Sequence, residues 1–277
     1  MIVWMRRSSL AIAACIVFAT LAHADVKLPN IFGDHMVLQR QMKIPVWGKA
    51  DPGEKVTVKI AGQEKTATAD DKGKWRVVFD AIEATDALEM TVSGKNTVTF
   101  KDVLIGEVWL CSGQSNMSFY LKSAANGEEA VKDSNRPKLR LFTVDRIIPN
   151  QPVDEMKGEW KVSSPETTPQ FSAVGYFFGQ QLQEKLNQPI GLINSSWGGT
   201  RAEAWIPRET FDALKLPYEP AWTEQWLHPK TEPGKKPQPE RPHEAPAVLY
   251  NGMIAPLAGF AMRGVIWYQG ETNTAYG

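Results

Sequence analysis

The sequence is poor in cysteine and histidine, with two cysteines and four histidines in 277 residues. Cys15 lies in an apolar segment at the amino terminus that we interpret below as a signal, so Cys111 is the only cysteine of the remaining chain. No internal disulfide can then form, and stability must come from a hydrophobic core. Because Cys111 belongs to the apolar run 108–111, we interpret it as a small buried hydrophobe rather than a reactive thiol.

Metal-ligand clusters, phosphate-binding loops and an excess of charge are also missing. The histidines are scattered, and no Gly-x-x-x-x-Gly-Lys motif occurs. Lys+Arg and Asp+Glu both number 31, so the formal net charge is zero, and the basic residues form no stripe interleaved with aromatics. These absences argue against nucleic acid as a partner. We expect neither a metal nor a cofactor.

The first 24 residues have the three parts of a secretory signal. A pair of arginines forms the basic start, residues 10–21 form the apolar run, and the small-x-small site Ala-His-Ala ends at Ala24. We expect cleavage after Ala24 and a periplasmic or secreted chain that does not associate with a membrane. A membrane anchor ranks lower because the run is shorter than the ~20 residues that span a bilayer. A lipoprotein site ending at Cys15 also ranks lower, because the apolar run continues well past it.

Residues 25–105 show the alternating pattern of short β-strands. Polar and apolar residues alternate over 56–60 and 88–92, which is typical of strands with one buried face. Turn signals that contain glycine occur at 51–53, 71–73 and 93–95. We predict a small β-sandwich-like amino-terminal domain. Such a module can bind a ligand by itself, but we favour a role in packing beside a catalytic domain.

From residue 106 the pattern changes to apolar strands that alternate with helices. Strands are predicted at 108–111, 139–144, 190–194 and 264–268. Strands alternating with helices form a parallel sheet that is covered on both faces. We therefore predict an α/β domain over 106–277.

The clearest helix of this domain lies between its second and third strands. Apolar residues recur every three or four positions at Phe171, Val174, Phe178, Leu182 and Leu186. Ser172 stands near the start of the helix, and Asn187 and Pro189 lie beyond its end. By contrast, residues 229–246 are rich in proline and charge, and we predict a surface loop without a core of its own.

The first candidate site follows the strand at 108–111. Ligands bind beyond the carboxyl ends of parallel strands, and the segment 112–117 there reads Ser-Gly-Gln-Ser-Asn-Met. At a strand-to-loop turn Ser115 can expose its hydroxyl, and its backbone N–H can face a developing oxyanion. Gly113 relieves crowding before the turn. Taken alone, Ser115 is explained equally well by a turn hydrogen bond or a helix N-cap.

Two further motifs also follow strands. The paired glycines Gly198 and Gly199 come after the strand at 190–194, where they either let a backbone N–H approach a ligand or simply make a tight turn. The segment 269–273 follows the last strand. The Gln269 carboxamide can donate to an oxyanion, or the segment can be an ordinary polar loop.

Together with two more segments, these motifs resemble the sialate O-acetylesterase family. This family is a carbohydrate acetylesterase branch of the SGNH hydrolase superfamily, and it is related to acetyl xylan esterases. The additional segments are 28–40, which reads Leu-Pro-Asn-Ile-Phe-Gly-Asp-His-Met-Val-Leu-Gln-Arg, and 250–257, which reads Tyr-Asn-Gly-Met-Ile-Ala-Pro-Leu. The similarity covers nearly the whole chain after residue 24. It implies an SGNH-hydrolase-like parallel sheet flanked by helices.

The resemblance also implies roles for individual residues. Ser115 would be the nucleophile, and its N–H would be one donor of the oxyanion hole. The Gly-Gly-Thr motif at 198–200 would supply a second N–H, which we assign to Gly199, and Gln269 would complete the hole. We expect further substrate contacts from Gln114, Asn116, Gly198, Thr200 and Glu271.

One part of the family pattern is missing. Its late Asp-x-x-His segment, in which the histidine is the general base and the aspartate orients it, does not occur in this sequence. None of His23, His35, His228 and His243 is predicted to replace it. A serine without a base is a weak nucleophile, so we expect the catalytic His and Asp to lie beyond residue 277 in a longer form of the enzyme. A natural truncation and a pseudoenzyme are the alternatives.

The sequence therefore predicts a serine esterase that removes O-acetyl groups from sialic acid or from acetylated polysaccharides through an acyl-enzyme. Trp197, Trp205 and Trp267 stand beside the motifs, where they either shape a sugar pocket or pack in the core. The main alternative is a catalytically incomplete carbohydrate-binding protein that retains the esterase scaffold. A lipase or thioesterase for long acyl chains is a further alternative.

Overall fold

The computed structural model describes residues 25–83, 86–215 and 241–274. The segment that we interpret as a secretory signal, the residues 229–240 of the predicted surface loop, and His23 and His228 lie outside these ranges. Among the described residues, no helix has both the length and the apolar character that crossing a membrane requires. The same residues contain no cluster of three or more potential metal-ligating side chains.

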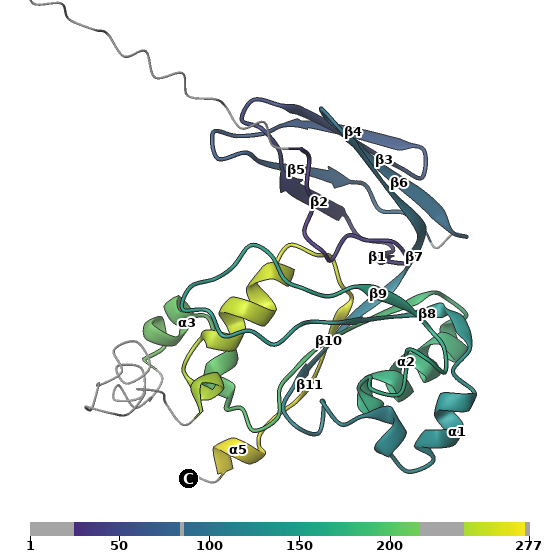
Figure 1. Cartoon of the computed structure of the whole chain (residues 1–277), viewed down its shortest axis with the longest axis vertical. Helices are drawn as coiled ribbons and strands as arrows, with labels where there is room; N and C mark the ends of the chain where they lie inside the picture. Colours follow the sequence, from purple (N-terminus) through teal and green to yellow (C-terminus); the bar gives the residue numbers. More distant parts are fainter. Residues whose placement is uncertain (1–24, 84–85, 216–240, 275–277) are drawn as a thin grey trace, which may run out of the picture.

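The strands and helices follow one another along the chain in a β-rich part and an α/β part (Figure 1). The strands are β1 (Val37–Gln39), β2 (Ile44–Lys49), β3 (Lys55–Ile60), β4 (Gln63–Thr68), β5 (Lys74–Phe79), β6 (Leu88–Ser93), β7 (Thr97–Gly113), β8 (Arg136–Thr143), β9 (Trp160–Ser163), β10 (Ile190–Ser196) and β11 (Gly264–Tyr268). The helices are η1 (Leu121–Ser123), α1 (Gly127–Lys132), α2 (Ala173–Leu186), η2 (Ala202–Trp205), α3 (Arg208–Ala213), η3 (Pro242–Glu244), η4 (Tyr250–Ile254), η5 (Ala255–Leu257) and α5 (Glu271–Thr274).

The amino-terminal part consists of two antiparallel sheets. One has the order β4-β3-β6-β7, and the other pairs β2 with β5. Apolar side chains of both sheets, such as Val46 and Val77 from one and Val58 and Val92 from the other, belong to one buried cluster. Alternation of buried and exposed residues along β3 and β5 produces this arrangement. The strands expected at 56–60 and 88–92 are therefore present, and they face a shared core.

The α/β part is built on strands in the order β11-β7-β10-β8-β9. β10 pairs in parallel with both β7 and β8, β11 pairs in parallel with β7, and only β9 is antiparallel. All seven residues of β10 are buried, as expected for a strand covered on both faces. Figure 1 shows α1 and α2 on one side of these strands and α3 with the segment around η4 on the other. The predicted α/β fold class is confirmed.

A single strand connects the two parts of the molecule. β7 is 17 residues long; its first half pairs with β6, and its second half pairs with β10 and β11. Residue 105, where we placed the domain boundary, lies inside this strand. The division into 25–105 and 106–277 stays a prediction, but the backbone of β7 runs through it without interruption.

Helix α2 has the expected ends, and part of the predicted apolar face packs against the core through Phe171, Phe178 and Leu182. Its N-cap is Ser172, whose hydroxyl accepts a hydrogen bond from Gly175 N at 3.0 Å, and its C-cap Asn187 is left-handed. Of the apolar residues that predicted the helix, Val174 and Leu186 are exposed. The buried positions include Gly179, where an added Cβ would meet the Leu192 side chain at 2.6 Å. Small residues let the helix approach the sheet closely, and the apolar periodicity did not show this.

The carboxyl-terminal end of the predicted surface loop is not a surface segment. Glu244 in η3 and Ala245 directly after it are buried. The Glu244 carboxylate accepts a hydrogen bond from Arg241 at 3.0 Å, and it lies 3.4 Å from Arg201 Nε. For residues 241–246 the expectation of a loop without its own core was wrong. The Glu244 carboxylate can be buried because Arg241 and Arg201 lie close to it and compensate its charge.

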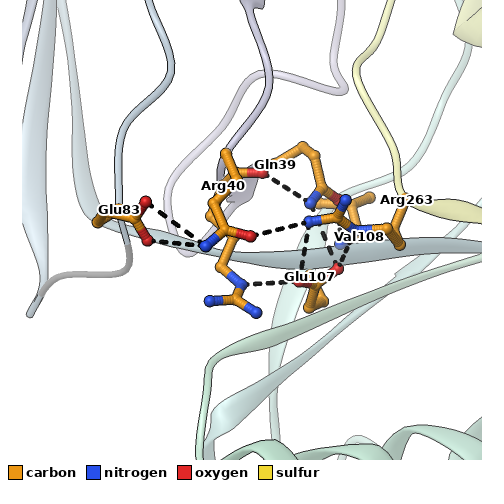
Figure 2. Close-up of polar contacts among 7 residues, drawn as sticks. Gln39, Arg40, Glu83, Glu107, Val108 and Arg263 are labelled. Atoms are coloured by element: carbon orange, nitrogen blue, oxygen red, sulfur yellow. Dashed lines mark hydrogen bonds and ion pairs between the residues drawn. The ribbon is translucent and has the colours of Figure 1, made fainter.

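A buried carboxylate joins β1, β7 and the residue before β11. The Glu107 side chain, 4% exposed, accepts hydrogen bonds at 2.7 Å from Arg40 Nε and from Arg263 Nε, and Gln39 contacts both Glu107 and the N–H of Val108. Figure 2 shows these side chains converging from separate segments. Burial by itself would raise the pKa of Glu107, but the hydrogen bonds from Arg263, Arg40 and Gln39 outweigh it and lower that pKa below 4.5.

Candidate functional site

The three predicted motifs begin at the same level of the sheet. Gly113, the last residue of β7, is in register with Ser196 of β10 and with Tyr268 of β11. Because the three strands are parallel, the loops that follow them leave from a common edge. This adjacency brings together segments that lie about 80 residues apart along the chain.

Ser115 lies in the turn directly after β7 and is exposed. The glycine motif of the neighbouring loop packs against it: a Cβ built on Gly198 would lie 3.3 Å from Ser115 Cβ and 3.4 Å from Ser115 Cα. A side chain at residue 198 would press on the serine. Gly198 therefore acts here through close packing with Ser115.

Two backbone N–H groups at this edge have no protein acceptor. Among the described residues, neither the N–H of Ser115 nor that of Gly199 donates a hydrogen bond. Gly199 has a φ of 72° and nothing within 4 Å of the place where a Cβ would be. Unsatisfied N–H groups beside an exposed hydroxyl are what an oxyanion hole requires. The assignment of these two donors remains a prediction that this geometry permits.

Gln114 connects the first motif to the third. Its side chain is buried, and its Oε1 accepts hydrogen bonds from the N–H groups of Gly270 at 3.2 Å and Thr272 at 3.3 Å. Its backbone N–H donates to Tyr268 O at 2.9 Å. The substrate contact expected of Gln114 stays a prediction, and its present contacts hold the loop after β11.

Gln269 is held by neighbouring groups. Its Nε2 donates to Thr200 O at 3.3 Å and to Asn273 Oδ1 at 2.5 Å. A substrate oxyanion would have to compete with these two acceptors for the carboxamide. Thr200 is buried, and its hydroxyl donates to Trp197 O and accepts from Trp205 Nε1. The roles predicted for Gln269 and Thr200 stay predictions, and their present contacts connect the second and third loops.

Asn116 and Glu271 face each other at the surface. Both are exposed, and Asn116 Nδ2 donates to Glu271 Oε1. These side chains come from the first and third loops, next to Ser115. Both side chains are exposed at this edge, and their roles as substrate contacts stay predictions.

The three tryptophans near the motifs differ in exposure. Trp205 is buried and bonded to Thr200, so it packs in the core. Trp267 is 47% exposed and packs edge-on against Trp205 with ring centroids 5.8 Å apart. Trp197 is half-buried, and its ring stacks on His243 and lies under the Arg146 guanidinium.

His35 lies far from Ser115. Val37, two residues after His35, is in register with Leu104 of β7, and β7 ends at Gly113. At roughly 3.3 Å per residue, nine residues of strand separate the two ends by about 30 Å. His35 Nδ1 instead contacts Asp102 at 2.7 Å, and Asp102 also pairs with Arg140. This histidine is structural, as expected.

His243 lies at the same end of the sheet as Ser115. Its ring stacks on Trp197, with centroids 5.2 Å apart and planes 5° from parallel. Burial lowers the pKa of His243, and the nearby Glu244 carboxylate offsets this only in part. In the described part of the chain no hydrogen bond joins Ser115 to His243 or to any other side chain.

Sequence reasoning missed two residues that shape this edge. Asn273 accepts hydrogen bonds from Gln269 and from Ala202 N at 3.0 Å and donates to Glu203 at 2.9 Å, so it fastens the third loop to the second. Arg146 follows β8, and its Nε donates to Ser196 O at 3.1 Å. The sequence did contain a signal for Arg146, because it is a charged residue just past a predicted strand, and ligands bind beyond the carboxyl ends of such strands.

Replacing Gly113 by Ala should destabilise the chain by about 2–3 kcal/mol. The φ of Gly113 is 136°, and a Cβ there would meet Tyr268 O at 2.1 Å, so the loops after β7 and β11 must move apart. Gly62→Ala is the matched control, because its φ is also positive but nothing lies within 4 Å. Chemical denaturation measures both; equal losses for the two variants would contradict the proposed crowding.

Comparison with known proteins gives consistent matches. Residues 105–276 match the family described as carbohydrate esterase, sialic acid-specific acetylesterase. The chain is 32% identical to sialate O-acetylesterase of Mus musculus, over 90% of this chain and 52% of that protein, and 32% identical to that of Homo sapiens, over 90% and 49%. A crystal structure of a carbohydrate acetylesterase from Xanthomonas citri matches with 36% identity and a TM-score of 0.77, over 90% of this chain and 52% of that one. The chain thus spans about half the length of these relatives.

Proposed function

Because the chain belongs to the carbohydrate esterase family of sialic acid-specific acetylesterases, we propose that it removes O-acetyl groups from carbohydrates, with Ser115 as the nucleophile. The observation that carries the proposal is the convergence of three loops at one edge of the sheet. There the exposed Ser115 packs against Gly198, and the N–H groups of Ser115 and Gly199 have no acceptor among the described residues.

The reaction proposed for this edge is acyl transfer through an acyl-enzyme. Ser115 Oγ forms a bond to the acetyl carbonyl carbon and gives up its proton to a general base, which the family resemblance places in an Asp-x-x-His segment. The carbonyl oxygen becomes an oxyanion that the N–H groups of Ser115 and Gly199 stabilise. Collapse breaks the bond to the sugar oxygen, which takes the proton back from the general base and leaves as a hydroxyl. Water then gives a proton to the same base and attacks the acetyl-serine; acetate is released, and Ser115 Oγ regains its proton from the base.

The substrate class proposed is an O-acetylated sugar, either a sialic acid or an acetylated polysaccharide. Named relatives act on sialate esters or carbohydrates, and the exposed Trp267 at the end of β11 offers an aromatic face of the kind on which sugars stack. We also propose that the chain is exported, on the basis of the basic, apolar and small-x-small pattern of its first 24 residues.

Acetate release from defined esters tests the activity. In a longer form that carries the Asp-x-x-His segment, we expect hydrolysis of 9-O-acetylated N-acetylneuraminic acid or acetylated xylan. In a series of nitrophenyl esters, we expect rates that fall as the acyl chain lengthens. A rate that rises with acyl length would instead indicate a lipase or thioesterase. Sugar binding without acetate release would favour the carbohydrate-binding alternative, for which the absence of a described hydrogen bond to Ser115 Oγ is the supporting observation.

A further inference from the structure

A cavity of about 500 Å³ lies where the amino-terminal part of the molecule meets the α/β part. Residues of β2 and β5 line it from one part, and residues 153–155 and 255–259 line it from the other. Among the described residues that line it, none belongs to the loops that directly follow β7, β10 and β11. Figure 1 shows β2 and β5 toward one end of the molecule and α5, which follows β11, toward the other. The cavity is therefore separate from the edge of the sheet that carries Ser115.

Trp47 gives this cavity an aromatic ring that is held in place. The side chain is half-buried and lines the cavity. The Phe32 ring packs edge-on against it with centroids 4.9 Å apart, and a Cβ built on Gly259 would lie 3.2 Å from the indole. Because these contacts restrict the ring already, little conformational entropy is lost when a ligand stacks on it. Sugar rings stack on the faces of indoles.

Polar side chains surround this ring. Arg76 is the antiparallel partner of Trp47, so the two side chains leave the same face of the two-stranded sheet. The Asp154 carboxylate lies 3.4 Å from Lys49 Nζ and 3.0 Å from Lys74 Nζ, and it thereby connects the α/β part to β2 and β5. A carboxylate accepts hydrogen bonds from hydroxyls, and ammonium and guanidinium groups donate to them. The lining therefore offers both kinds of partner that a sugar hydroxyl uses.

The charges of the lining nearly balance. It contains four cations and three carboxylates, which are Lys27, Lys49, Lys74 and Arg76, and Asp70, Asp154 and Glu155. An anionic ligand would have to compete with Asp154 for Lys49 and Lys74. A cationic ligand would have to compete with the same lysines for Asp154. The lining therefore favours a neutral polar ligand over a charged one.

We propose that this cavity is a second carbohydrate site, which binds a neutral mono- or disaccharide with one sugar ring stacked on Trp47. An uncharged ring that carries several hydroxyls matches an aromatic surface surrounded by paired charges. A volume of about 500 Å³ lies within the range of small-molecule sites. The inference goes beyond the proposed function, because it involves no acetyl group and no residue of the edge that carries Ser115. On a polysaccharide, the site would hold sugar units away from the one that is deacetylated.

The indole N–H signals in two-dimensional NMR spectra test this inference without any turnover. Cellobiose, xylobiose and lactose would be titrated into the intact chain, with digalacturonic acid as the charged comparison. Trp47 and Trp75 both line the cavity, whereas Trp267 lies at the end of β11 beside the Ser115 loop. Substitution of each tryptophan by phenylalanine assigns its signal. We expect at least one neutral disaccharide to shift the signals of Trp47 and Trp75, with an affinity ten-fold or more above that of the acid.

Two substitutions in the cavity then locate the site. Trp47→Leu keeps an apolar contact with Phe32 but removes the aromatic face, so it should weaken the binding that the Trp75 signal reports ten-fold or more. Trp267→Leu, at an exposed tryptophan outside the cavity, is the matched control and should leave that binding unchanged.

Ala258→Leu tests the site without removing any packed side chain. Ala258 is exposed and lines the cavity, so a larger side chain there should obstruct the ligand and weaken its binding. Ala125→Leu, at an exposed alanine outside the cavity, should not. Unfolding midpoints close to that of the unsubstituted chain establish that the variants are folded. If Trp47→Leu does not fold, Ala258→Leu decides the test.

Several results would overturn the inference. These are the absence of any shift of the Trp47 and Trp75 signals with the neutral disaccharides, binding of the acid as tight as that of the sugars, and binding that persists undiminished in Ala258→Leu. Each of them leaves the proposed function unaffected, because acetate release is measured separately. Failure to release acetate would in turn leave the second carbohydrate site unaffected.

Discussion

In a longer form that carries the family's Asp-x-x-His segment, Ser115→Ala should lower acetyl-ester turnover by at least ~10³-fold, because loss of the nucleophile leaves only binding and oxyanion stabilisation. The structure gives Ser115 the position that this role needs, exposed in the turn after β7 and packed against Gly198. Hydrolysis of nitrophenyl acetate and covalent labelling by a fluorophosphonate probe, located by mass spectrometry, both measure the loss.

Ser123→Ala is the control for this experiment. Ser123 is an exposed serine in η1, eight residues further along, and its described hydrogen bond is a backbone one to Tyr120. Its substitution should leave both rate and labelling unchanged. Turnover that persists in Ser115→Ala would remove Ser115 as the nucleophile. Turnover without labelling at Ser115 would indicate that ester hydrolysis here proceeds by another route.

Glu107→Ala should lower the free energy of unfolding by about 3–5 kcal/mol, since removing one partner of a buried ion pair leaves the others without compensation. The side chain is 4% exposed, and its loss would leave Arg40, Arg263 and Gln39 without their shared acceptor. These residues join β1, β7 and the start of β11 (Figure 2). The substitution should therefore weaken the contacts that hold β1, β7 and the start of β11 together.

Chemical denaturation measures this loss, with Glu64→Ala as the matched control. Glu64 pairs with Lys59 at 2.8 Å, but both side chains are more than half exposed, so its substitution should cost less than about 1 kcal/mol. Similar losses of unfolding free energy for the two variants would mean that burial does not strengthen the ion pairs of Glu107 with Arg40 and Arg263.

The same carboxylate should contribute to acid sensitivity. The pKa of Glu107 is lowered in the folded chain, so its stabilisation is complete above its ordinary pKa of 4.5 and is lost as the pH falls through the folded value. Between about pH 6 and about pH 3, the unsubstituted chain should therefore lose more stability than Glu107→Gln. Chemical denaturation at several pH values measures both; the same loss of stability in the unsubstituted chain and in Glu107→Gln would contradict a contribution of Glu107 to acid sensitivity.

Local patterns predicted six of the strands and helix α2, because hydrophobic periodicity and capping residues reflect backbone conformation directly. The last strand was predicted at 264–268 and β11 occupies those residues, while Ser172 and Asn187 mark the ends of α2 as capping chemistry requires. The family resemblance drawn from five ordered segments is confirmed by the family match over 105–276. Strand positions, helix ends and family motifs all depend on residues that are close together along the chain, so they can be recognised in the sequence.

Contacts between distant residues were decided by the tertiary structure. Periodicity predicted that Phe178 and Leu182 of α2 face the core, as they do, but it did not show that Gly179 lies on the same face, where only a small residue fits against Leu192. The substrate contact expected of Gln114 stays a prediction; what the tertiary structure adds is that Gln114 Oε1 accepts from Gly270 N, because β7 and β11 end at the same level.

The sequence alone was sufficient to identify the family, the strand-and-helix order and Ser115 as the candidate nucleophile, since these rest on short motifs and local periodicity. Only the tertiary structure showed that β7 runs unbroken through both parts, that Gly198 packs on Ser115, and that Arg146 donates to Ser196 O. Strand order and register bring these groups together across long stretches of chain, and no local pattern specifies that pairing.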